Sequence, residues 1–144
     1  MNHGLEILAN EVGLTSPANE PLRLTFGLAC VERVRHLLEE PQVVACLDAL
    51  GRYVRNEIDR RTFDAARDNA ARLANQHPGS KSIDGTSRAA VSATYAVANA
   101  LAGKALQAAS YAAYATVYAY GGYAVRDPDS FAQEYAWQVT ALRD

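Results

Sequence analysis

The sequence contains few of the residues that break helices or cross-link small folds. Among its 144 residues there are 9 glycines, 5 prolines and 2 cysteines, whereas 49% are hydrophobic. This composition excludes a disordered or collagen-like chain, and the length fits a single domain over residues 1–144. Cys30 and Cys46 are not spaced as a Cys-x-x-Cys pair, and a helical hairpin that turns near Pro41 would offset them by roughly 7 Å along its axis, so we expect two free thiols and a cytoplasmic protein.

An excess of charge of one sign is also absent. Lys and Arg number 14 against 16 Asp and Glu, which gives a formal net charge of -2 and no basic run that would bind nucleic acid. The first residues lack the basic start and apolar run of a signal peptide. Residues 105–125 carry no charge, but only Leu106, Val117 and Val125 among them are strongly apolar, so we expect no interaction with a membrane.

Motifs for catalysis, metal binding and phosphate binding are missing as well. His3, His36 and His77 lie on separate segments without a second ligand at helical spacing, so we expect no metal site. Gly79-Ser80-Lys81 lacks the earlier glycine and the strand of a phosphate-binding loop. No nucleophile motif is present. We therefore expect a protein that has no cofactor and is not an enzyme.

Alanine is what the sequence has in abundance, with 28 residues, and this favours helices that pack closely through small side chains. Apolar residues recur at helical spacing, most regularly at Val43, Leu47, Leu50, Val54 and Ile58. We expect an all-α fold, a single compact bundle or stack of five to six antiparallel helices with an Ala-rich C-terminal half. Before the main internal loop, which we expect at 77–86, the chain should form a loosely held arm or short helix at 1–18, helices at 20–40 and 41–58, and a helix capped by Asp59. After the loop we expect one helix from Thr86 or Ser87 to about Leu101 and another from Lys104 to about Tyr120. A last helix should follow Asp127-Pro128.

A stripe of tyrosines is the most informative feature of the second half. Tyr111, Tyr114 and Tyr118 are spaced i, i+3 and i+7, and the stripe continues backwards through polar residues. The rings either bridge core and surface with only the hydroxyl in water, or form a partner surface. Trp137 lies away from the apolar side of the last helix, where it is either exposed or covered by the N-terminal arm. The candidate partner-binding residues are Lys104, Gln107, Tyr111, Tyr114, Tyr118 and Trp137.

Several short segments together resemble one protein family. They are Leu28-Ala29-Cys30-Val31-Glu32-Arg33-Val34, Leu50-Gly51-Arg52, Ala65-Ala66-Arg67 and Arg88-Ala89-Ala90. Over roughly residues 24–120 the chain is similar to the bacterial "putative immunity protein" family, small Ala-rich helical proteins of polymorphic toxin systems. The resemblance implies a cytoplasmic, non-enzymatic protein that binds one toxin domain and blocks it.

Three functional hypotheses follow from these observations. The first is a protein-binding module, an immunity-type inhibitor that neutralises a cognate bacterial toxin domain or binds another protein partner. The second is a helical small-molecule-binding protein with a tyrosine-lined pocket. The third is self-association into a homo-oligomer through the same tyrosine face.

Overall fold

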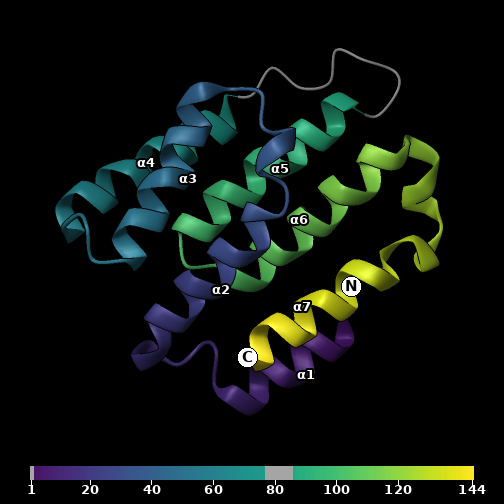
Figure 1. Ribbon diagram of the computed structural model, residues 1–144, viewed down its shortest axis with the longest axis horizontal. Helices are drawn as coiled ribbons and strands as arrows, with labels where there is room; N and C mark the ends of the chain where they lie inside the picture. Colours follow the sequence, from purple (N-terminus) through teal and green to yellow (C-terminus); the bar gives the residue numbers. More distant parts are fainter. Residues whose placement is uncertain (1, 77–85) are drawn as a thin grey trace.

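The computed structural model describes residues 2–76 and 86–144, and within these ranges it is helical and contains no strand (Figure 1). The expected all-α class is confirmed. The number of helices differs from the expected five to six, because the N-terminal segment also forms a helix. Residues 77–85, most of the expected main loop, lie outside the described residues. The described part has seven α-helices: α1 His3–Val12, α2 Glu20–Glu32, α3 Pro41–Val54, α4 Arg60–Asn75, α5 Thr86–Leu101, α6 Ala105–Tyr120 and α7 Ala132–Arg143.

The Ala-rich helices α5 and α6 form a tight hairpin that α2 crosses (Figure 1). Gly103 closes the turn between α5 and α6 with a φ of 76°, a conformation that glycine adopts without steric cost. Where α2 meets α5, a β-carbon added to Gly27 would lie 3.3 Å from the Cβ of Ala100. The small side chains therefore bring the helix backbones close together. The fully buried alanines of the hairpin are Ala93, Ala96, Ala108, Ala109, Ala112, Ala113 and Ala115.

A second hairpin, α3 and α4, flanks α5. Val43, Leu47 and Leu50 of the predicted stripe are buried in the core, so the helical spacing identified the inner face of α3 correctly. The helix ends at Val54, earlier than the expected residue 58, because Asn56 adopts a left-handed conformation with a φ of 62°. The Asp59 side chain accepts a hydrogen bond from the backbone N–H of Thr62 and caps α4, as expected.

The prediction of one helix over residues 20–40 is correct up to residue 32 and wrong beyond it. α2 ends at Glu32, and a single 3-10 turn at Arg35–Leu37 follows. Pro41 disfavours a helical conformation at the preceding residue, and Glu40 is accordingly extended at φ -97° and ψ 121°. Arg33 also leaves the helix to pair with a carboxylate on α7. No glycine follows Glu32 to signal the end of α2, so the helical spacing of apolar residues continues beyond the point where the helix stops.

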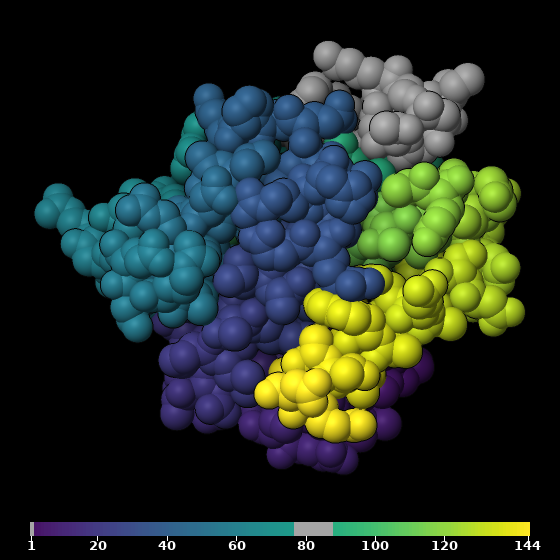
Figure 2. Space-filling model, viewed as in Figure 1, coloured from purple at the N-terminus to yellow at the C-terminus, as the bar shows by residue number. Residues whose placement is uncertain are grey.

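Helices α1 and α7 pack on each other beside α2 and α6. In the space-filling view, the atoms of α7 (yellow) lie over those of α1 (purple), while α4 (teal) forms the opposite flank (Figure 2). Two 3-10 turns, Gly122–Arg126 and Pro128–Phe131, connect α6 to α7. Among the described residues, no helix has the length and apolar composition needed to cross a bilayer. Both cysteines are buried and free, in agreement with the expectation from their spacing.

Candidate functional site

A groove opens between α1, α6 and α7, and we call it the tyrosine groove. Its volume is about 460 Å³, within the range of sites that hold a small molecule or an anchoring side chain. Most of its wall comes from α6, with one flank from α1 and the floor from α7. The residues that line it are Asn2, Leu5, Glu6, Leu106, Gln107, Ser110, Tyr111, Tyr114, Tyr135 and Gln138.

The floor of the tyrosine groove is a buried amide. The Gln138 side chain is only 1% exposed, and its Nε2 donates a hydrogen bond of 2.8 Å to the backbone carbonyl of Ala109 on α6. Its Oε1 accepts a hydrogen bond of 3.1 Å from Nδ2 of Asn2. Because a buried amide is costly without partners, these bonds hold the side chain in one orientation. Gln138 thus joins all three helices that form the groove.

Asn2 fixes α1 in this arrangement. Its Oδ1 accepts a hydrogen bond of 3.1 Å from the backbone N–H of Leu5 and caps the helix, while its Nδ2 also donates to the backbone carbonyl of Tyr135. One side chain therefore caps α1 and attaches it to α7.

Replacing Asn2 with alanine is expected to lower the free energy of unfolding by about 2 kcal/mol, because the substitution removes the cap and leaves Gln138 with one unpaired buried oxygen. The measurement is urea denaturation followed by circular dichroism. The control is Asn10→Ala on the exposed side of the same helix, with an expected change below about 0.5 kcal/mol. Equal losses in the two variants would contradict a tethering role for Asn2.

The rim of the groove consists of tyrosine rings held in place by other rings. Tyr111 and Tyr114 are each 38% exposed. Tyr111 stacks on Tyr95 of α5 with ring centroids 5.4 Å apart, and Tyr114 meets the edge of Phe131 at 5.1 Å. These contacts order the rings before any partner binds, so the surface has little conformational entropy to lose on binding.

The polar atoms of the rim are available to a ligand. Within the described part of the chain, the hydroxyls of Tyr111, Tyr114 and Tyr135 and the side chains of Gln107 and Ser110 have no hydrogen-bond partner. Burial, and then the neighbouring Tyr114, raises the pKa of the half-buried Tyr135 above the usual value of a tyrosine, so its hydroxyl remains a hydrogen-bond donor even in mildly alkaline solution. The groove therefore offers apolar ring faces and a row of hydrogen-bond donors.

The structure brings together only some of the residues that the sequence analysis grouped. Gln107, Tyr111 and Tyr114 line the groove, whereas Tyr118 lies beyond it and is half-buried, with its ring 6.2 Å from that of Tyr114. Lys104 is exposed at the N-terminus of α6, outside the groove.

Trp137 requires a correction. The indole was expected either to be exposed on the same surface or to be covered by the N-terminal arm. It is half-buried on another side of α7, beneath the guanidinium of Arg33, whose Cζ lies 4.1 Å from the ring centroid. The physical reason is a cation–π contact with a residue from α2, which the pattern of α7 alone does not reveal.

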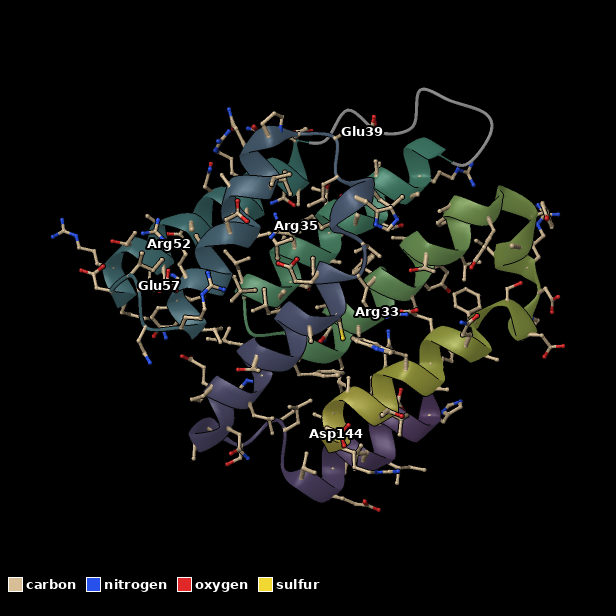
Figure 3. All side chains as sticks on the ribbon, in the orientation of Figure 1. Arg33, Arg35, Glu39, Arg52, Glu57 and Asp144 are labelled. Atoms are coloured by element: carbon tan, nitrogen blue, oxygen red, sulfur yellow. The ribbon has the colours of Figure 1, made fainter. Side chains whose placement is uncertain are left out.

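Next to Trp137, Arg33 forms a bidentate ion pair with Glu134. Nε donates to Oε1 at 2.7 Å and Nη2 to Oε2 at 2.9 Å, and Glu134 is only 5% exposed. Figure 3 shows Arg33 where α2, α6 and α7 meet. Beside this pair, burial and then the Glu134 charge raise the pKa of the Cys30 thiol to about 12, which keeps it in the protonated, unreactive form.

A smaller cavity of about 230 Å³ adjoins the ion pair, with His36 and Tyr120 on its wall. The guanidinium and carboxylate there are already paired with each other, so the cavity offers a ligand few free charges. No cluster of three His, Cys, Asp or Glu side chains arranged for a metal ion occurs within residues 2–76 and 86–144.

Sequence reasoning missed the contribution of α1 to the groove. Asn2, Leu5 and Glu6 belong to the segment expected to be an arm or a short helix. An asparagine directly ahead of a helical pattern is a capping signal, and Asn2 could have predicted the start of α1. Gln138 on α7 is harder to predict, because its hydrogen-bond partners lie 29 and 136 residues away in the sequence.

No protein-family model, no curated protein and no solved structure matches the chain.

Proposed function

We propose that the chain is a non-enzymatic protein-binding module and that the tyrosine groove receives an apolar anchor from its partner. The observation that supports this most directly is the pair of part-exposed tyrosine rings, Tyr111 and Tyr114, ordered by neighbouring rings above a fixed floor. Tyrosine is enriched among the residues that dominate binding energy at protein interfaces. Partial exposure of rigid rings beside a cavity is the arrangement in which such residues act.

The nature of the partner is the second part of the proposal. The resemblance to the putative immunity proteins supports a cognate bacterial toxin domain as the partner, which the chain would bind and inhibit in the cytoplasm. The overall charge of -2 supplies little long-range steering, so affinity has to come from contacts within the groove.

The experiment is affinity capture of the tagged full chain from its host, followed by titration of the captured partner. Replacing Tyr114 with alanine is expected to weaken binding about 30-fold or more, because the variant loses a central, desolvated ring. Tyr123→Ala is the matched control, since Tyr123 is 79% exposed and does not line the groove, and its affinity should change by less than about twofold.

Two further results decide the proposal. If Tyr111→Ala and Tyr114→Ala both keep the circular dichroism spectrum of the native chain and both bind with native affinity, the groove is not the binding site. If the captured partner has a toxic activity that the chain does not suppress, the inhibitor role is wrong, while the binding module remains.

A second function, small-molecule binding, is favoured by the groove volume of about 460 Å³ and its buried amide floor. A thermal-shift screen tests it. A compound that stabilises the native chain but not Tyr114→Ala supports this function. Light scattering of the same samples tests self-association, because a dimer that Tyr114→Ala dissociates places a second copy in the groove.

A further inference from the structure

We propose that the occupant of the tyrosine groove is an extended, proline-rich segment of the partner protein. This inference rests on the proposed function, that the groove binds a protein. It is carried by three properties of the groove: its volume, its hydrogen-bond donors and its charge.

The dimensions of the groove favour an extended segment over a helix. The volume of about 460 Å³ corresponds to roughly one turn of an α-helix, which is about 10–12 Å across with its side chains, so a whole helix does not fit within the groove. Addition of a strand is excluded for the described residues, since they form no sheet edge to which a strand could pair. A polyproline II segment is narrow, and it binds to aromatic-lined grooves in other proteins.

The hydrogen-bonding groups of the rim match this backbone. A polyproline II helix has no internal hydrogen bonds, and its carbonyls accept hydrogen bonds from outside. The tyrosine groove presents unpartnered hydroxyls on Tyr111, Tyr114 and Tyr135 and an unpartnered amide on Gln107. Proline supplies acceptors only, so it leaves no backbone donor unsatisfied against these groups.

The spacing along α6 fits the repeat of such a segment. Gln107 and Tyr114 are seven residues apart on one face, which is about 10.5 Å along the helix axis. One turn of polyproline II advances about 9.3 Å. Carbonyls three residues apart in the segment can therefore meet donors at both positions, while a proline ring between them packs against the ring of Tyr111.

The charge of the groove indicates which residues flank the prolines in the partner segment. Glu6 is the only charged residue among the described residues that line the groove, and its side chain is 39% exposed. The imidazole Nδ1 of the exposed His3 lies 3.8 Å from a carboxylate oxygen of Glu6. A neutral segment with an arginine or lysine at one end would place that charge next to Glu6, whereas an acidic segment would be repelled.

The test is titration of the full chain with a fluorescein-labelled peptide of about ten prolines ending in arginine, followed by fluorescence anisotropy. We expect saturable binding with a dissociation constant below about 1 mM.

Tyr114→Phe, which removes only a hydroxyl, should weaken the binding of this peptide about fivefold. Tyr123→Phe is the matched control and should change it by less than about twofold. Glu6→Gln should abolish the preference for this peptide over the same peptide ending in glutamine.

The comparison peptide is an alanine- and glutamine-rich helical peptide of about 20 residues, the length an isolated helix needs in water, with the same terminal arginine. Tighter binding of this peptide, or binding of the proline peptide that is insensitive to both Tyr114→Phe and Tyr111→Ala, would overturn the inference.

Binding of the captured partner distinguishes a wrong occupant from a wrong function. If Tyr114→Ala weakens the partner but the proline peptide does not bind, the occupant is wrong and the proposed function stands. If the partner binds both Tyr111→Ala and Tyr114→Ala with native affinity, the groove is not the binding site and the proposed function itself fails.

Discussion

Replacing Gly27 with leucine is expected to lower the free energy of unfolding by about 3 kcal/mol or more and the melting temperature by about 10 °C. Gly27 lies where α2 crosses α5, and even a β-carbon there would be 3.3 Å from Cβ and 3.5 Å from Cα of Ala100. A backbone atom cannot move aside as the end of a flexible side chain can. The leucine therefore forces α2 away from the Ala-rich hairpin and opens a contact that several helices share.

The control for this substitution is Gly122→Leu. Gly122 is exposed, and no atom lies within 4 Å of the β-carbon that a substitution would add. Thermal and urea unfolding of both variants should show a change below about 0.5 kcal/mol for Gly122. Leucine also has a higher helix propensity than glycine, by about 0.8 kcal/mol, so a stabilised Gly27 variant would show that α2 and α5 are not closely packed.

Features that depend on one helix could be predicted from the sequence. The inner face of α3, the cap at Asp59 and the end of α6 at Tyr120 follow from periodicity and from local residue types, and the structure agrees with each. The end of α2 could not be predicted, because Val34 and Leu37 continue the helical pattern through a segment that the structure holds in a 3-10 turn.

Features that depend on several helices were predicted only in part. The stripe on α6 identified Tyr111 and Tyr114, but the groove also requires Asn2, Gln138 and the position of α1 against α7. The side chains of Asn2 and Gln138 meet across 136 residues of sequence. A single sequence carries no signal for such a pair, since each residue alone is an ordinary polar side chain.

Glu134 is the most buried charged side chain among the described residues, and no sequence pattern marked it. Glu134→Ala is expected to lower the free energy of unfolding by about 3 kcal/mol, because it leaves the guanidinium of Arg33 without its carboxylate. The expected loss is at the lower end for buried ion pairs, since the Arg33 side chain is 37% exposed and water can replace part of the lost interaction. Urea denaturation measures the loss.

A double substitution separates the loss of the pair from the loss of packing. Arg33→Met with Glu134→Leu removes both charges and fills the same space, so the double variant should regain most of the stability lost in Glu134→Ala. Arg35→Ala provides the exposed control: its bonds to Glu32 and Asp48 lie at the surface, and their loss should cost less than about 1 kcal/mol. If the double variant is as unstable as Glu134→Ala, the cost arises from the shape of the site between α2 and α7. If it recovers, the cost is that of a charge left without its partner, and the ion pair then serves to fix α7, which carries Tyr135 and Gln138 of the tyrosine groove, against α2.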